Sequence, residues 1–507
     1  MQNAVVILCL VVSVIAALRW PFFGALAILL TAILRDTILF EFGPYFFWIH
    51  SVEALYIATL VSAVLARPEG LAEFVPRTMV DWGMLGFYLV LLASAMVNGV
   101  DIYEHKYIDL FFHATVLYFL LSRLADTPRR VAIMAATILV PTAYLAFLAW
   151  SKYRAGIVRY ARPYYISSFH IFGLQMALTL PLIGALLAKP FRLPTRAVLL
   201  ALPPVLLLVW LGSQSRTEFV MISLALGAGS LAATTSALAV RLGLLGLVPL
   251  FVLTAIRTQS RSAYLGIALG LLMLAWFHRK RWAAVLVLAL PLVAYAILHQ
   301  PAAVMMRVTS IWTGQLEPGV KDSSIQGRWE QMRTAMNILS SSPTSAMLGV
   351  GPRQFYTQYQ EYVSEEDRGD PDRQWTMHSV PLLILCEEGL MGFAVYYGLL
   401  VIGSLREATK AIRRTRGDPQ MEMVGTLAAA GLMGFLAFLA YGLGQPQMWV
   451  INIYATVAMV TAARRVADAR LAEREAAEGE LPVTGSAAPR GAGVTEIAFS
   501  GYSPERG

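Results

Sequence analysis

Charged side chains are scarce in this sequence. They make up 14% of its 507 residues, against roughly a quarter in a typical soluble domain. Hydrophobic residues make up 57%, and they collect in runs near the ~20 residues that cross a hydrocarbon core. A soluble globular protein is therefore excluded. Five such runs are 80–97, 131–150, 197–211, 283–298 and 423–441.

The apolar runs also lack the alternation of polar and apolar residues that a membrane-spanning strand shows. Backbone groups in lipid must be hydrogen-bonded internally, so these runs must be helices. We predict an all-α fold, a polytopic transmembrane helical bundle of about 12–15 helices, with one large periplasmic loop that contains short helices. The predicted domains are 1–299 (N-terminal transmembrane helices), 300–378 (periplasmic loop), 379–466 (C-terminal transmembrane helices) and 467–507 (disordered cytoplasmic tail).

Cysteine is nearly absent. Cys9 and Cys386 lie far apart inside apolar runs, so they cannot form a disulfide framework or a metal cluster. Asp370 and Asp372 have Asp-x-Asp spacing but lie in an acidic loop, and we assign them no metal. We expect no cofactor. Residues 1–18 lack a basic leader segment and a clear cleavage site, which indicates a first helix rather than a cleaved signal.

A nucleic-acid-binding module is also missing, so the net charge of +8 has another source. Membrane proteins collect lysine and arginine in short cytoplasmic loops, and we expect no nucleic-acid partner. Four dense basic clusters are therefore predicted to face the cytoplasm, and the 300–378 loop then faces outward. The clusters are Arg123, Arg129 and Arg130; Lys189, Arg192 and Arg196; residues 278–281; and residues 406–416.

Within the outer loop, residues 327–340 have the periodicity of a helix. Trp329, Met332, Met336 and Leu339 fall on one side of it. We therefore predict a short amphipathic helix with these four side chains on a common face.

Positive charge recurs on the predicted outer side, where it should be depleted. Any single outer cation could be an interfacial anchor whose stem lies along apolar surface. As a set at helix mouths, they favour binding of an anion with several oxygens, because a guanidinium binds phosphate with two parallel hydrogen bonds. A pyrophosphate on a lipid carrier would meet them at headgroup depth. The set includes Lys106, Arg162, Arg216, Arg261 and Arg328.

His378 ends the outer loop, directly before an apolar run. A histidine near its ordinary pKa can act as a general base at neutral pH, although a lone interfacial histidine is more often structural. Glu388 follows ten residues later, about 15 Å further along the same predicted helix. We expect Glu388 to bond a neighbouring helix rather than to touch His378.

Four motifs between residues 258 and 392 resemble those of the O-antigen ligase and O-antigen polymerase family. Their order and spacing agree with the family pattern. They are a Ser-Arg segment at 258–266, a Gly-Arg segment at 322–329, a Gly-x-Gly turn at 348–355, and His378-Ser379 followed by Glu388, Gly389 and Gly392. Upstream, Arg162-Pro163 resembles the family's arginine segment, and Lys106 falls where the family has an outer basic residue. Residues 18–24 resemble the O-glycosylation ligases found with exosortase systems.

The resemblance implies a metal-independent, inverting glycosyltransferase of cell-envelope polysaccharide biosynthesis. It would be a multi-pass protein of the bacterial inner membrane with a periplasmic active face. The donor would be a glycan on undecaprenyl pyrophosphate, and the acceptor a glycan, lipid A core or protein. His378 would be the catalytic base. The pyrophosphate-binding residues would be Arg261, Arg328, Arg162, Lys106 and Arg216.

Two departures from the family pattern leave alternatives open. Ser379 stands where asparagine often follows the histidine, and the Ser-Arg motif occurs twice, so Arg216 and Arg261 compete for one role. Spacing to Arg328 and His378 favours Arg261. The sequence does not separate a ligase from a polymerase. The rival interpretation is a transporter or flippase of an anionic lipid-linked glycan, which would carry its charges in mid-helix rather than at helix ends.

Overall fold

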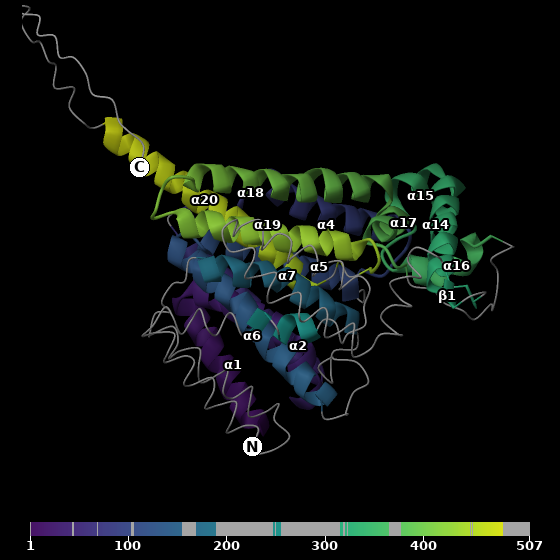
Figure 1. Ribbon diagram of the computed structural model, residues 1–507, viewed down its shortest axis with the longest axis horizontal. Coiled ribbons are helices and arrows are strands. Elements are labelled where there is room, and N and C mark those ends of the chain that lie inside the picture. Colours follow the sequence, from purple (N-terminus) through teal and green to yellow (C-terminus); the bar gives the residue numbers. More distant parts are fainter. Residues whose placement is uncertain are drawn as a thin grey trace, which may run out of the picture. The chain divides into compact units, whose positions relative to one another are not determined.

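The computed structural model describes residues 2–42, 45–67, 69–102, 106–154, 169–188, 247–248, 250–254, 315–317, 320–321, 323–364, 377–446, 448 and 450–479. The first part of the chain is helical (Figure 1). Its elements are α1 (Gln2–Arg19), α2 (Pro21–Phe42), α3 (Tyr45–Leu65), the 3₁₀ turn η1 (Gly70–Phe74), α4 (Met79–Val97), α5 (Lys106–Leu124), α6 (Pro128–Arg154) and α7 (Phe169–Ala188).

The described residues of the second part form a small hairpin and two groups of helices. Strands β1 (Gln315–Glu317) and β2 (Val320–Lys321) pair antiparallel. The first group of helices is α14 (Ser323–Ser341), α15 (Pro343–Leu348) and α16 (Gln354–Tyr362). The second group is α17 (Val380–Phe393), the π-helical segment η2 (Ala394–Val401), α18 (Ile402–Thr415), α19 (Glu422–Gly442) and α20 (Ile451–Gly479).

Five helical segments in the described part are long and apolar enough to cross a membrane: Met79–Val97, Tyr107–Leu124, Pro128–Ser151, Val380–Thr415 and Glu422–Gly442. The prediction of an all-α, polytopic membrane protein is confirmed. The predicted runs 80–97, 131–150 and 423–441 coincide with α4, α6 and α19. The runs 197–211 and 283–298 lie outside the described residues, and the total of 12–15 helices stays a prediction.

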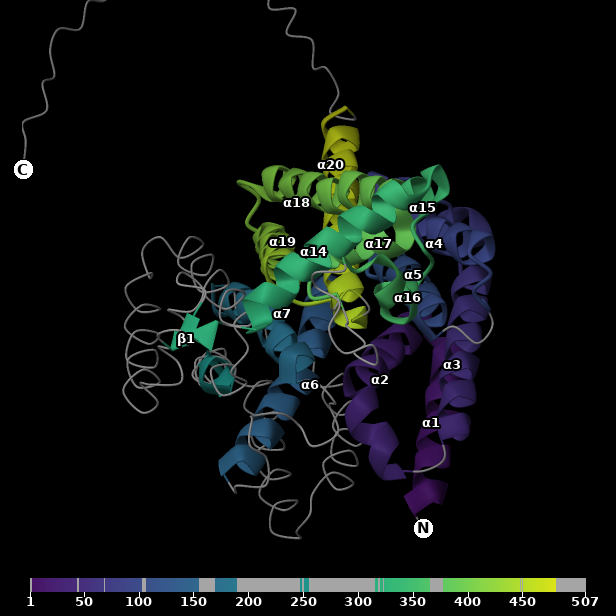
Figure 2. The same ribbon diagram turned by 90° about the vertical axis from the view of Figure 1, so that its right-hand side faces the viewer.

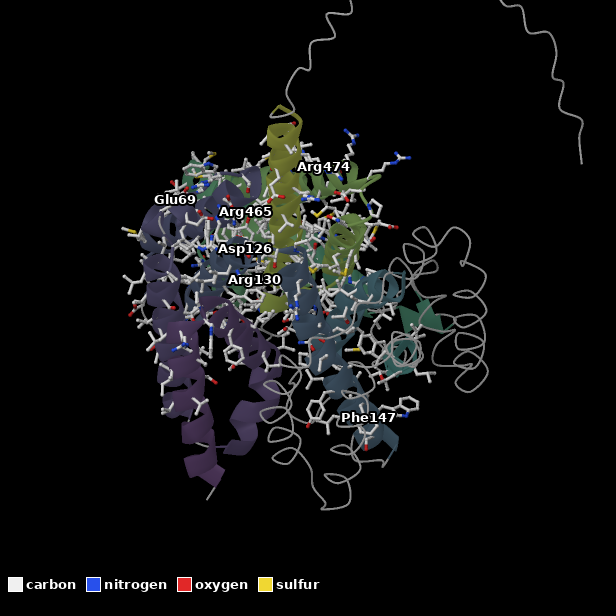
Figure 3. The ribbon with its side chains drawn as sticks, turned by 90° about the vertical axis from the view of Figure 1, so that its left-hand side faces the viewer. Glu69, Asp126, Arg130, Phe147, Arg465 and Arg474 are labelled. Carbon is white, nitrogen blue, oxygen red and sulfur yellow. The ribbon has the colours of Figure 1, made fainter. Side chains whose placement is uncertain are left out.

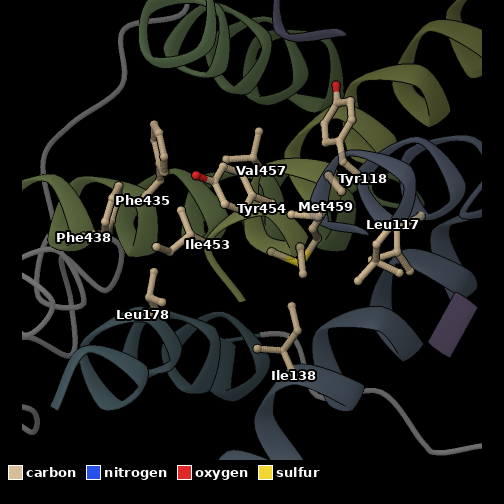
Figure 4. Packing of buried hydrophobic residues seen from close by; sticks show 14 of the residues in the cluster. Leu117, Tyr118, Ile138, Leu178, Phe435, Phe438, Ile453, Tyr454, Val457 and Met459 are labelled. Atoms are coloured by element: carbon tan, nitrogen blue, oxygen red, sulfur yellow. The ribbon is translucent and has the colours of Figure 1, made fainter. Parts of the chain in front are cut away.

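The chain divides into two compact units, Met1–Asp468 and Ala469–Gly507. In the first unit, α7 and α19 pack closely because Gly434 has no side chain. A Cβ at Gly434 would come within 2.6 Å of the Leu178 carbonyl oxygen. Small residues at such contacts let two membrane helices approach. Figure 4 shows the apolar core around them, with Leu178 and Ile138 opposite Phe435, Ile453 and Met459.

A buried ion pair marks one end of α4. The Arg123 guanidinium donates to the Asp81 carboxylate at 2.6 Å, and the Tyr118 hydroxyl donates to it at 2.7 Å. Asp81 also caps α4, since the backbone N–H groups of Arg77 and Thr78 donate to it, each at 2.9 Å. Arg123 is therefore not a surface cation of the predicted loop cluster, because its side chain is only 1% exposed.

One other member of that cluster, Arg130, lies in an ion-pair network at the same end. Asp126 accepts from Arg130 at 2.7 Å and from Arg67 at 3.2 Å. Arg67 donates at 3.0 Å to Glu73, which also pairs with Arg465. In Figure 3, Asp126, Arg130 and Arg465 lie near one another and away from Phe147, which is further along α6.

The basic helix α18 reaches this same end of α4. A Cβ at Gly403, near the start of α18, would lie 3.0 Å from a Val80 methyl. Residues 406–416, the fourth predicted cytoplasmic cluster, follow along α18 and the turn after it. The described parts of two predicted cytoplasmic clusters therefore lie at one end of the bundle.

Candidate active site

Helix α14 carries the first residue of the candidate site, Arg328, and its buried face anchors the second. Gln331, Thr334, Ala335 and Ile338 recur at helical spacing and are at most 1% exposed. Figure 2 faces this region and shows α14 beside α15 and α17, with α16 close by.

The predicted helix over residues 327–340 is confirmed as part of α14. Trp329, Met332 and Met336 do share a side, but they are 58%, 39% and 60% exposed. The helix packs instead through a stripe that includes the polar residues Gln331 and Thr334. The Thr334 hydroxyl donates a hydrogen bond to the Glu330 carbonyl oxygen at 3.0 Å. Because its hydrogen bond is made, burial of this polar group costs little.

His378 lies against this buried stripe. Its backbone N–H donates to the Gln331 side-chain oxygen at 2.9 Å, which ties the end of the outer loop to α14. The ring nitrogen Nδ1 is buried and has no hydrogen-bond partner in the part of the chain that the structure describes. Two residues later Val380 begins α17, with Pro381 in its first turn. The imidazole therefore sits at the mouth of a membrane helix with one ring nitrogen that makes no hydrogen bond to the described residues.

The electrostatic surroundings of His378 favour the neutral ring. Burial and the positive charge of Arg328 together hold the pKa of His378 below its ordinary value. Desolvation disfavours the imidazolium, and a nearby cation disfavours it further. A neutral imidazole can accept a proton from a hydroxyl group. Arg328 and His378 are thus the two sequence-predicted site residues whose interaction the structure describes.

A second contact ties the outer helices to the membrane helices. Gly389 interrupts α17 with φ 66°, and Gly349, which ends α15, has φ 72°. The two breaks face each other, because a Cβ on Gly349 would come within 2.3 Å of the Glu387 backbone, and one on Gly389 within 2.4 Å of the Met347 backbone. Positive φ and lack of space both require glycine here.

Hydrogen bonds hold these two breaks together. The Val350 N–H donates to the Cys386 carbonyl at 2.9 Å, and the Gly351 N–H donates to the Glu387 carbonyl at 3.0 Å. Helix α4 joins them: the Ser94 hydroxyl lies 2.8 Å from the Glu387 carbonyl oxygen, and the Asn98 amide donates to the Gly349 carbonyl at 3.2 Å. The Gly-x-Gly turn is therefore pinned at the end of α4 opposite the Asp81–Arg123 pair.

A comparison with known protein families shows which family the segment that contains these residues resembles. The family described as O-antigen ligase matches residues 245–397, a segment that contains Arg328, the Gly-x-Gly turn, His378 and the Gly389 break. This part of the chain is similar to O-antigen ligases. The predicted family resemblance is confirmed, and the chain is a multi-pass membrane protein with a domain of glycan-transferring enzymes. No curated protein matches the chain.

For the four other predicted site residues the structure describes no side-chain contact. Arg162, Arg216 and Arg261 lie outside the described residues. Lys106 is the first residue of α5. Of these four, only Arg261 lies within the ligase domain match.

Arg353 is a ligase-domain cation that the sequence analysis did not select. It has a left-handed backbone, with φ 59°, and its exposed guanidinium lies over the rings of Tyr107 and Tyr356, at 5.5 and 5.9 Å from their centres. Tyr107 directly follows Lys106, so Arg353 meets α5 next to a predicted site residue. Its position within the predicted outer loop was the signal available in the sequence.

Proposed function

We propose that the protein transfers a glycan from an undecaprenyl-pyrophosphate carrier to an acceptor hydroxyl at the periplasmic face of the inner membrane. The observation that carries the proposal is His378, a half-buried residue whose Nδ1 is buried without a described hydrogen-bond partner. It lies near Arg328 at a helix mouth, within the segment that matches O-antigen ligases. A general base and a phosphate-binding cation are the two groups that this reaction requires.

In the proposed reaction, the acceptor oxygen attacks the anomeric carbon of the donor sugar and loses its proton to His378. The bond between that carbon and the phosphate oxygen breaks, and undecaprenyl pyrophosphate leaves with the electron pair. Arg328 stabilises the charge that develops on the leaving group. Arg261, Arg162, Lys106 and Arg216 are the further proposed pyrophosphate-binding residues. A single displacement inverts the anomeric configuration, and arginines take the place that a metal ion holds in other transferases.

Lipid A core, a second lipid-linked glycan and a protein hydroxyl are the acceptors to be separated. The test is transfer by the purified protein in detergent, from a defined undecaprenyl-pyrophosphate glycan to each acceptor in turn. A new glycosidic bond together with released undecaprenyl pyrophosphate supports the proposal. Detergent solution has no second compartment, so a transporter or flippase would form no product. Absence of product with every acceptor would contradict the transferase.

A further inference from the structure

Helix α16 begins without a cap of its own. Its N-cap residue, Arg353, makes no side-chain capping bond, so the first N–H groups of the helix need partners from elsewhere. The side chain of Glu387 on α17 lies beside them, where the backbone N–H groups of Arg353 and Phe355 favour its charged form.

Glu387 therefore contacts residues 349–363 through both its backbone and its side chain. Its backbone carbonyl accepts from Gly351 at 3.0 Å, and its side chain lies beside the start of α16. Glu387 is 4% exposed and Phe355 1% exposed, so this contact lies in the interior rather than at the surface.

From α16 the contacts continue to the candidate base. The Tyr359 hydroxyl, on the second turn of α16, donates to the Glu330 carboxylate on α14. The next residue on α14, Gln331, accepts the backbone N–H of His378 at 2.9 Å, and Arg328 lies two residues before Glu330. A shift of α16 would therefore be passed to both Arg328 and His378.

We propose that Glu387 is a positioning residue for glycan transfer, which sets the places of His378 and Arg328 through α16 and α14. The inference rests on the proposed function. Glu387 itself touches no reacting atom. Its carboxylate fixes α16 on the membrane helix, α16 fixes α14, and α14 holds the base and the phosphate-binding cation at the distance that transfer requires. Small misplacements of catalytic groups can reduce rates by up to about 100-fold.

The neighbouring Glu388 supplies a matched control. It is 0% exposed, yet neither of its carboxylate oxygens has a hydrogen-bond partner among the described residues. The expectation that Glu388 bonds a neighbouring helix stays a prediction, since the described residues supply no partner for it. Glu388→Gln keeps the shape of the side chain and removes no described hydrogen bond.

The test compares Glu387→Ala, Glu387→Gln and Glu388→Gln in purified full-length protein. We expect Glu387→Ala to lower kcat for transfer about 10- to 100-fold, with KM for the donor within about threefold because the donor contacts remain. Glu387→Gln keeps one accepting oxygen and should recover part of that loss. Glu388→Gln should stay within about twofold of the wild type. Unchanged kcat in Glu387→Ala would overturn the inference, as would equal losses in Glu387→Gln and Glu388→Gln.

Amide hydrogen exchange in peptides that cover residues 349–363 separates this inference from the proposed function. In Glu387→Ala and Glu387→Gln, we expect faster exchange at the start of α16, and in Glu388→Gln no change. Unchanged exchange in both Glu387 variants would overturn the inference even if the enzyme transfers glycan. If the wild-type protein transfers nothing while exchange rises as expected, the proposed function fails and the role of Glu387 is confined to holding the outer helices.

Discussion

The imidazole of His378 is held neutral by its surroundings, and this property can be tested at the scale of single residues. Burial and Arg328 lower its pKa, so the basic form is present at neutral pH and is lost only as the pH falls through the lowered value. Transfer that depends on the neutral ring should therefore fall on the acid side of neutrality.

Removal of the charge of Arg328 should move that acid limb. In Arg328→Gln the cation that disfavours imidazolium is gone, so the pKa of His378 rises towards its ordinary value. We expect the acid limb of kcat/KM to shift to higher pH. The pH at which modification of His378 by diethyl pyrocarbonate reaches half its maximum rate should shift in the same direction. An acid limb that stays in place would show that Arg328 does not influence the base.

Arg328 should not be replaceable by lysine. Arg328→Lys keeps the charge but loses the two parallel N–H donors that match a phosphate group. Loss of one charge-assisted hydrogen bond costs about 1.5–3 kcal/mol, so donor affinity should fall roughly 10-fold or more. Equilibrium binding of an undecaprenyl-pyrophosphate glycan measures it. Donor affinity equal to the wild type in both Arg328→Lys and Arg328→Ala would contradict the assignment.

Some of these residues could be predicted from the sequence, and others could not. His378 and Arg328 stand out because their types and motif spacing carry chemical meaning before any fold is known. Glu387 and Arg353 do not, because their roles come from contacts between segments that meet only in space. The Ser94–Glu387 contact, for example, joins residues 293 positions apart.

The break in α17 is the feature that matters most at the scale of single elements. Gly389 lets the helix change direction where the Gly-x-Gly turn docks, and both its φ of 66° and its 2.4 Å approach to the Met347 backbone exclude a side chain. The break therefore couples an outer turn to a membrane helix.

Gly389→Ala should accordingly destabilise the protein and reduce transfer. The strained backbone conformation and the clash together should cost at least ~2 kcal/mol, seen as a lower midpoint of thermal unfolding in detergent. Gly398→Ala is the matched control, since a Cβ there would have nothing within 4 Å of it and the φ of Gly398 is ordinary. Equal midpoints in the two variants would contradict the packing described here.

At this scale the sequence predicted where helices occur better than it predicted which face of each helix is buried. The runs that became α4, α6 and α19 were found because their length and hydropathy are decided locally. The helix α14 was found as well, but apolar periodicity alone does not say which face is buried, and Trp329, Met332 and Met336 are exposed. Which side of a short outer helix is covered depends on α15, α16 and α17.

In the described part of the first unit, the two predicted cytoplasmic clusters that the structure describes lie at the end of α4 opposite the candidate site. Asp81, at one end, pairs with Arg123, and Asn98, at the other, binds the Gly349 carbonyl. About 25 Å of helix separates the two. The sequence predicted this opposition from the distribution of lysine and arginine. It also predicted which end faces the cytoplasm, and that part stays a prediction.

Cysteine labelling of intact cells measures the orientation. In a background with Cys9→Ala and Cys386→Ala, Ser340→Cys on α14 and Gln420→Cys beside the basic helix α18 place single thiols at exposed positions. A reagent that enters the periplasm but not the cytoplasm should label the first and not the second. Labelling of Gln420→Cys alone would reverse the topology and remove the periplasmic mechanism with it.

The central claim is that His378 is the general base of glycan transfer, and the most direct measurement is the single-turnover transfer rate of folded His378→Ala beside its donor affinity. Loss of a general base costs about 10²–10⁴-fold in rate, and the contacts to the pyrophosphate are untouched. The account therefore predicts a fall of that size with donor affinity within a few-fold of the wild type. A transfer rate within a few-fold of the wild type would contradict it and reduce His378 to an anchor between the outer loop and α17.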